Sequence, residues 1–258
     1  MQVTTLGAGD PRVVVAGAVH GDEPCGARAI ERFLAEDHDV QRPVKFIVLN
    51  EPALAENVRY IDTDVNRTLP GDPMSDLYER RLAYDFINEI VGCVGLGLHS
   101  TVSYDRPFGS NANPNERKRG LFTSLSLLDN VVDFTPVTRG NRCVDLPQFV
   151  DLEAGEQWSD QAAENAYNCM MDFLKFTGVL DDEVKRTETT EYRVFDFYRK
   201  EEEHNYHFLA ENFELVEEGE IYASQNGENV IAEQDFYPVL FSDEGHENLF
   251  GYHASLIK

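Results

Sequence analysis

Residues 13–24 read VVVAGAVHGDEP, and this stretch decides the fold of the chain. A β-branched run ends at Gly17, a turn follows, and Pro24 opens a predicted helix. The turn brings together an imidazole, His20, and a carboxylate, Glu23. An imidazole and a carboxylate can supply two of the three protein ligands of a catalytic Zn²⁺, which keeps a fourth position open for water.

The third ligand should come from the end of a neighbouring strand. An apolar segment, residues 94–99, ends on His99 and is followed by small polar residues. Strands are also predicted at 12–16 and 44–50, with a helix at 24–36 between them, which favours a parallel crossover. Because parallel strands present their carboxyl ends at one edge of a sheet, His20, Glu23 and His99 are expected to meet there.

The rest of the chain predicts an α/β domain followed by a smaller β domain. An edge strand is expected at 2–6, amphipathic helices at 75–92 and 158–176, and a further strand at 148–153. Short strand-like runs follow an acidic linker near 181–187. The predicted division is a catalytic domain over 1–182 and a small C-terminal β domain over 183–258.

Two segments have no clear periodicity. Residues 51–73 are polar and rich in turn-forming residues, and a long irregular segment in a compact domain often carries function. Residues 108–119 contain Pro, Asn and the basic cluster Arg117-Lys118-Arg119, and they are expected to form a solvated loop.

Four blocks, in order and spacing, resemble the succinylglutamate desuccinylase/aspartoacylase family. They are HGDEP at 20–24, NVRYIDTDVNR at 57–67, LHST at 98–101 and LEAG at 152–155. The resemblance implies a zinc-carboxypeptidase-like domain with a mostly parallel mixed sheet flanked by helices, and a small C-terminal β domain. It also implies one Zn²⁺ per chain, held by His20, Glu23 and His99, although Mn²⁺ or Co²⁺ stays an open alternative.

The resemblance further assigns roles around the metal. Glu153 corresponds to the general base, with Glu156 in reserve, and Arg59 to a group that stabilises the developing oxyanion. Asn66 and Arg67 are expected to bind the α-carboxylate of the substrate, since an amide and a guanidinium are forked donors suited to a carboxylate. Asp64 is expected to orient these donors.

Three departures from the family leave the substrate open. Gly97 stands two residues before His99, where aspartoacylases have Asp, so a partner for the histidine ring is expected to be missing. The family's substrate-binding Tyr-rich stretch reads EGHE at 244–247 here, which makes His246 a candidate in its place. Either Arg139 or Arg142 is the candidate for reading a second substrate carboxylate.

Charge and cysteine content limit which partners and which cell compartment are expected. The formal net charge of −25 argues against nucleic acid or an anionic membrane as a partner, because phosphate surfaces require a basic footprint. Acid spread along the whole chain favours a halophilic cytosol over an ordinary acidic protein. Four widely spaced cysteines without a Cys-x-x-Cys pair are expected to be buried thiols, and with no leader-like or membrane-spanning run they predict a cytoplasmic protein.

The sequence therefore predicts a zinc-dependent amidohydrolase that cleaves the amide bond of an N-acyl amino acid, of the N-acetylaspartate or N-succinylglutamate type. The alternatives are a metallocarboxypeptidase-like peptidase and a non-catalytic metal- or ligand-binding member of the fold. The acyl group, the amino acid and any association into a homo-oligomer stay open.

Overall fold

The computed structural model describes residues 1–201, 204–245 and 248–257. Its helices are α1 (Cys25–Ala35), α2 (Glu51–Glu56), α3 (Tyr78–Ile90), α4 (Glu116–Phe122) and α5 (Asp160–Phe176), with 3-10 turns η1 (Val65–Arg67) and η2 (Cys143–Asp145). The strands of the first part of the chain are β1 (Gln2–Leu6), β2 (Val13–Gly17), β3 (Val44–Val48), β4 (Val94–Thr101), β5 (Phe108–Asn111), β6 (Asn130–Asp133) and β7 (Phe149–Glu156). Those of the last part are β8 (Thr190–Tyr198), β9 (Tyr206–Phe208), β10 (Ile221–Gln225), β11 (Glu228–Ile231), β12 (Tyr237–Val239) and β13 (Gly251–Leu256).

A ten-stranded mixed sheet runs through the molecule in the order β1-β3-β2-β4-β7-β5-β6-β8-β13-β12. Its centre, β3-β2-β4-β7, is parallel, as the strand-helix-strand pattern predicted. The edge strand β1 pairs antiparallel with β3, and β5 pairs antiparallel with β7. The predicted fold class, a mostly parallel mixed sheet with flanking helices, is confirmed.

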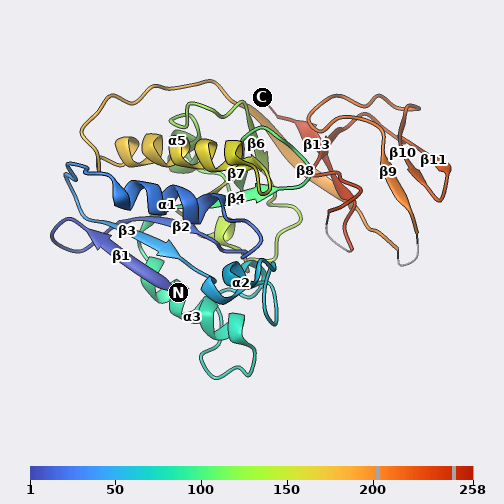
Figure 1. Ribbon diagram of the computed structural model, residues 1–258. Coiled ribbons are helices and arrows are strands. Elements are labelled where there is room, and N and C mark those ends of the chain that lie inside the picture. Colours follow the sequence, from blue (N-terminus) through green and yellow to red (C-terminus); the bar gives the residue numbers. More distant parts are fainter. Residues whose placement is uncertain (202–203, 246–247, 258) are drawn as a thin grey trace.

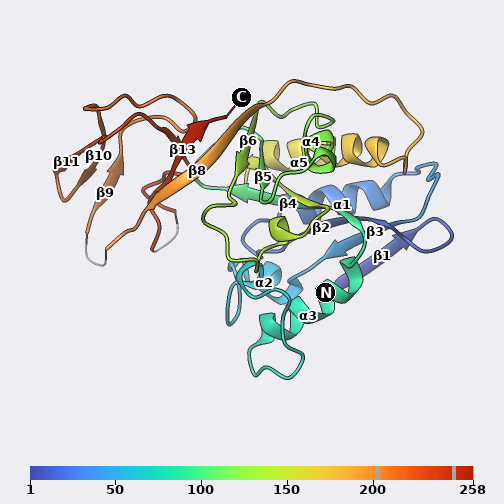
Figure 2. The same cartoon turned by 180° about the vertical axis from the view of Figure 1, so that it is seen from behind.

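Helices cover the central sheet on both faces (Figure 1). On one face α1 and α5 lie side by side, and α4 joins them in the view from behind (Figure 2). On the other face α3 packs Leu82, Ala83 and Phe86 against Val14 and Ala16 of β2. Strand β2 is buried along its whole length because it lies between these two helical layers.

The close approach of α1 to the sheet depends on two glycines. A Cβ on Gly17 would lie 2.5 Å from the backbone of Gly26, and a Cβ on Gly26 would lie 2.7 Å from the Cβ of Leu98. These contacts bring the first turn of α1 against the ends of β2 and β4. The turn that carries His20 and Glu23 is therefore fixed beside β4.

The C-terminal part forms strands on two sheets. Strands β9, β10 and β11 make a separate three-stranded sheet, which confirms the expected small β unit. Strands β8, β12 and β13 instead extend the main sheet, and they pack against Phe108, Val132 and Phe134. The division into domains at 182/183 stays a prediction, since the main sheet continues across it.

The two segments without periodicity contain regular structure. The expectation of a solvated loop at 108–119 is wrong, because Phe108–Asn111 is the buried strand β5 and α4 begins at Glu116. Lys118 in the basic cluster is fully buried, and its ammonium donates to the carbonyl oxygens of Ala112 and Val144 at 2.6 and 2.7 Å. Residues 51–73 begin with the short helix α2 and contain η1.

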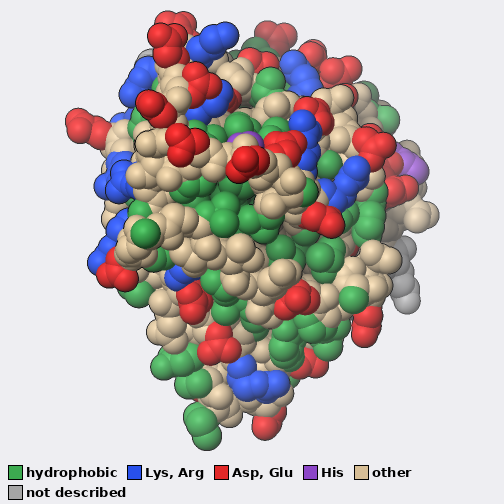
Figure 3. Space-filling model, turned by 60° about the vertical axis from the view of Figure 1, so that its left-hand side comes forward, with side chains coloured by type: hydrophobic (Ala, Val, Ile, Leu, Met, Phe, Trp, Pro, Cys, Tyr) green, Lys and Arg blue, Asp and Glu red, His purple; other side chains and the backbone are tan. Residues whose placement is uncertain are grey.

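The surface is acidic in the way the composition indicated. Acidic side chains are scattered over the face shown in Figure 3 and are not gathered in one patch. The four cysteines are free and buried, as expected. None of the helices in the described ranges is both long and apolar enough to cross a membrane.

Candidate metal centre

His20 and Glu23 lie in the turn between β2 and α1, and both are almost completely buried. The turn is tight: a Cβ on Gly21 would lie 2.1 Å from the backbone of Ala53 in α2. The backbone amide of Glu23 donates to the carbonyl oxygen of His20 at 3.3 Å. Local sequence therefore places the imidazole and the carboxylate on the same side of the turn.

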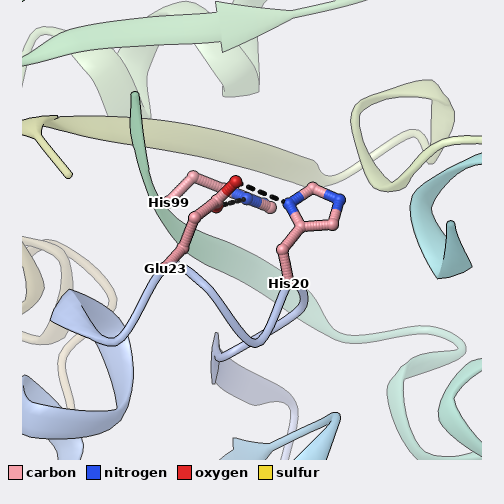
Figure 4. A group of neighbouring side chains, drawn as sticks. All are labelled: His20, Glu23 and His99. Atoms are coloured by element: carbon pink, nitrogen blue, oxygen red, sulfur yellow. Dashed lines mark hydrogen bonds and ion pairs between the residues drawn. The ribbon is translucent and has the colours of Figure 1, made fainter. Parts of the chain in front are cut away.

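His99 comes from the neighbouring strand β4 and completes a cluster of three buried ligand atoms (Figure 4). One oxygen of Glu23 lies 2.8 Å from Nδ1 of His20, and the other lies 2.8 Å from Nδ1 of His99. The three ligand atoms lie within 4.8 Å of one another. Two imidazoles and a carboxylate converging in this way fit the donor set of a catalytic Zn²⁺ site.

The charges of the cluster also favour a cation. Burial opposes charge on His99, but the carboxylates of Asp151 and Glu23 outweigh it and raise the pKa of His99 to about 10. Burial likewise opposes charge on Glu23, yet the two imidazoles hold the pKa of that carboxyl well below its usual range. A divalent cation would take the place of the protons that these ligands otherwise bind.

Arg59 and Asp64 lie directly beside the cluster. Arg59 Nη1 donates to Glu23 Oε1 at 3.0 Å, and Arg59 Nη2 donates to Asp64 Oδ2 at 3.1 Å. Asp64 Oδ1 lies 3.1 Å from Nε2 of His20, the ring nitrogen that faces away from Glu23. Asp64 thus contacts both His20 and Arg59, and Arg59 Nη2 itself lies 3.0 Å from Nε2 of His20.

Asn66 and Arg67 lie on η1, just beyond Asp64. The side-chain oxygen of Asn66 accepts from the backbone amide of Cys143 at 2.8 Å, and this bond fixes the orientation of the side-chain amide. Arg67 Nη1 donates to the carbonyl oxygen of Asn66 at 2.7 Å. The carboxylate whose charge acts most strongly on Arg67 is that of Asp64.

Of the two candidate arginines before the general base, Arg142 is the one near Arg67. Burial lowers the pKa of the Arg67 guanidinium, and the positive charge of Arg142 lowers it further. Nε of Arg142 is buried and has no partner among the described residues, whereas Arg139 is exposed. Arg142 is therefore the half-buried one of the two, and its charge acts on Arg67.

Glu153 lies on β7 directly opposite His99 of β4. Burial raises the pKa of its carboxyl to about 7, although the positive charge of His99 opposes the shift. Gly155 has φ +120° and packs so closely that a Cβ there would lie 2.6 Å from the carbonyl oxygen of Asp105. Glu156, the reserve candidate, is exposed. His246 lies outside the described residues.

Two buried carboxylates near the site were missed from the sequence. Asp151 precedes Glu153 by two residues and lies 3.6 Å from Nε2 of His99, too far for a hydrogen bond but close enough for a charge interaction with the ring. Strand alternation could have found it, because residues two apart share a face. Glu79 on α3 is fully buried and binds the backbone of residues 61–63.

Comparison with known proteins points the same way as this geometry. Residues 9–101 match the family model of the succinylglutamate desuccinylase/aspartoacylase catalytic domain. The chain is 30% identical over 109 residues to an aspartoacylase from Xenopus tropicalis, covering 36% of this chain and 35% of the relative. It is 33% identical over 113 residues to an N-acyl-aromatic-L-amino acid amidohydrolase (carboxylate-forming) from Rattus norvegicus, covering 36% of this chain and 34% of that one. These matches span about a third of the length of the curated relatives.

Solved structures extend the likeness in fold to the whole chain. A succinylglutamate desuccinylase/aspartoacylase from Rhodobacter sphaeroides superposes with a TM-score of 0.79 at 17% identity, covering 99% of this chain and 89% of that one. Murine aminoacylase 3 gives a TM-score of 0.74 at 22% identity and covers 97% of each chain. Residues 9–101 thus match the succinylglutamate desuccinylase/aspartoacylase catalytic domain, and the whole chain shares the fold of these solved structures.

Proposed function

We propose that this protein is a zinc-dependent amidohydrolase that cleaves the amide bond of an N-acyl amino acid. The observation that carries the proposal is the buried convergence of His20, Glu23 and His99, with Glu153 on the adjacent strand. The matched relatives include an aspartoacylase and an N-acyl-aromatic-L-amino acid amidohydrolase, which supports this reaction class.

Three residues would hold the metal: His20 and His99 through Nδ1, and Glu23 through its carboxylate. The chemistry that a bound Zn²⁺ supplies is activation of a water molecule and polarisation of the scissile carbonyl. The second ring nitrogen of His20, Nε2, lies 3.1 Å from Asp64 Oδ1 and 3.0 Å from Arg59 Nη2. Such contacts fix the tautomer and the orientation of a ligating ring.

Glu153 would act as general base and then as general acid. It takes a proton from the attacking water and later donates that proton to the departing amine nitrogen. A carboxyl whose pKa lies near 7 can do both at neutral pH, and burial raises the pKa of Glu153 to about 7. Arg59, with its guanidinium against Glu23, would stabilise negative charge on the former carbonyl oxygen.

The substrate's carboxylate groups would be bound by the guanidinium groups of Arg67 and Arg142 and by the neutral amide nitrogen of Asn66. The positive charge of Arg142 opposes that of Arg67, so an anion bound beside Arg67 would be stabilised. This arrangement favours an N-acyl amino acid with more than one carboxylate, such as N-acetylaspartate or N-succinylglutamate.

The test is amine release from a panel of N-acetyl and N-succinyl amino acids at high salt, with metal content measured on each protein. Wild type should hydrolyse at least one dicarboxylate, whereas Glu153→Gln should retain zinc and lose nearly all turnover. Glu156→Gln tests the reserve assignment and should remain active. A zinc-loaded wild type that hydrolyses short peptides and no N-acyl amino acid would favour the peptidase, and one that hydrolyses neither would favour a binding role.

A further inference from the structure

We propose that Asp151 is the positioning residue for the metal ligand His99, and that Gly97 is glycine because Asp151 occupies the space in front of it. The inference rests on the proposed metal site but concerns how strongly that site holds its ion. It depends on the pairing of two neighbouring strands, β4 and β7.

His99 needs a partner at its second ring nitrogen. Nδ1 of His99 faces Glu23, so Nε2 points the other way, and it is buried without a hydrogen-bond partner among the described residues. Asp151 Oδ2 lies 3.6 Å from this nitrogen. The carboxylate is itself buried, and its Oδ1 has no hydrogen-bond partner within the described residues.

Nε2 of His99 and Oδ2 of Asp151 would form a hydrogen bond if the 3.6 Å between them shortened slightly. A buried ring N–H and a buried carboxylate oxygen each carry a desolvation cost when left unpaired. When a metal ion draws on Nδ1, Nε2 must carry the proton and becomes a stronger donor. Asp151 is then placed to accept that proton's hydrogen bond and to hold the ring in its ligating orientation.

The side chain of Asp151 on β7 occupies the volume that a side chain at position 97 of β4 would need. Residues 97 and 151 are directly opposite each other, and Gly97 lies on the same face of β4 as His99. A Cβ on Gly97 would lie 2.2 Å from Asp151 Oδ1. A carboxylate on either strand would reach this one location, but the location cannot hold both.

The same relation exists on the other histidine. Asp64 Oδ1 lies 3.1 Å from Nε2 of His20. Each of the two imidazole ligands thus has a carboxylate from a different segment of the chain beside its outer nitrogen, at hydrogen-bond distance in His20 and at 3.6 Å in His99. In His20 the guanidinium of Arg59 also lies there, at 3.0 Å. We infer that Asp151 completes a matched pair of orienting carboxylates.

The experiment measures zinc affinity directly by chelator competition, without substrate. Asp151→Asn keeps the shape of the side chain and should weaken zinc binding about 10- to 100-fold. The metal-free variant should still fold, as shown by its melting temperature and circular dichroism. Asp133→Asn is the matched control, because Asp133 is a buried strand carboxylate that pairs with Arg193, away from the metal ligands. It should leave zinc affinity unchanged even if it lowers stability.

A swap of the carboxylate between strands gives the sharper test. Gly97→Asp alone should disturb the site, because two carboxylates would crowd one buried space. Asp151→Gly alone should bind zinc as weakly as Asp151→Asn. The double variant Gly97→Asp/Asp151→Gly should bind zinc at least tenfold more tightly than Asp151→Gly, since the carboxylate returns from the other strand.

The cobalt-loaded proteins provide a spectroscopic readout, since the visible bands of Co²⁺ report ligand geometry. They should differ from wild type in Asp151→Gly and return toward it in the double variant. The proposal is overturned if folded Asp151→Asn binds zinc within about twofold of wild type. It is also overturned if the folded double variant binds no better than Asp151→Gly; should that variant not fold, Asp151→Asn decides alone. Failure of wild type to bind zinc at all would instead refute the proposed metal site.

Discussion

Glu79 offers a quantitative test of how the loop beside the metal centre is held. Its buried carboxylate accepts from the backbone amides of Ile61, Asp62 and Thr63 at 2.6, 2.9 and 3.1 Å. It also accepts from the side-chain amide of Asn50 at 3.1 Å. One carboxylate on α3 therefore fixes the segment between Arg59 and Asp64, the two residues that lie against the metal ligands.

Glu79→Gln keeps the size of the side chain but leaves a single oxygen as acceptor. Two of the four donors then face an amide NH₂ group. Because each hydrogen bond to a charged group contributes about 1.5–3 kcal/mol, the loss is roughly 3–6 kcal/mol. A surface segment that loses this much stabilisation does not keep its position, so we expect the 61–63 loop to open locally before the core unfolds.

Hydrogen exchange of the amides at residues 61–63 measures this opening without substrate, and protection should fall by at least a hundredfold. If the proposed function holds, kcat/KM should fall about 10- to 100-fold with zinc still bound, because Arg59 is displaced while the metal ligands are not. Asp85→Asn, which removes an exposed carboxylate from the same helix, is the control and should change neither quantity. Protection of the 61–63 amides within threefold of wild type would refute the reasoning.

The remaining predictions concern Glu153, Arg67 and Lys118. Because the base must be ionised and burial raises the pKa of Glu153 to about 7, kcat/KM should fall as pH drops through about 7, or through a lower value when a bound cation adds positive charge; a flat profile between pH 8 and 4 would contradict this. Arg67→Ala should raise KM for a dicarboxylate at least tenfold with a smaller change in kcat, whereas an unchanged KM in steady-state kinetics would remove it from the substrate site. Burial lowers the pKa of Lys118 from 10.5 to about 8. The buried ammonium therefore reduces the free energy of unfolding in full below pH 8, and this destabilisation shrinks as pH rises toward 10.5. The melting temperature of wild type relative to Lys118→Met should therefore rise from pH 7 to pH 9.5, and a constant difference would speak against a buried ammonium.

The sequence by itself determined the central fold and the cluster of candidate ligands. A β-branched run, a glycine turn and Pro24 are signals within a dozen residues, so β2, the turn and α1 could be predicted from local rules. The parallel order of β3, β2 and β4 then follows from the crossover, and it brings His99 to His20 and Glu23. The resemblance to the family, and no local rule, implied roles for Arg59, Asp64, Asn66 and Arg67, and these roles stay predictions.

Only the tertiary structure decided which other polar residues are buried beside these. The carboxylates of Asp151 and Glu79 and the ammonium of Lys118 look like ordinary surface charges in the sequence, since their partners lie on strands or loops far away along the chain. Strand register decides that Asp151 faces Gly97 and His99, and packing of α3 decides that Glu79 faces the 61–63 backbone. Burial of a charge depends on contacts between distant segments, and no periodicity within one segment encodes such contacts.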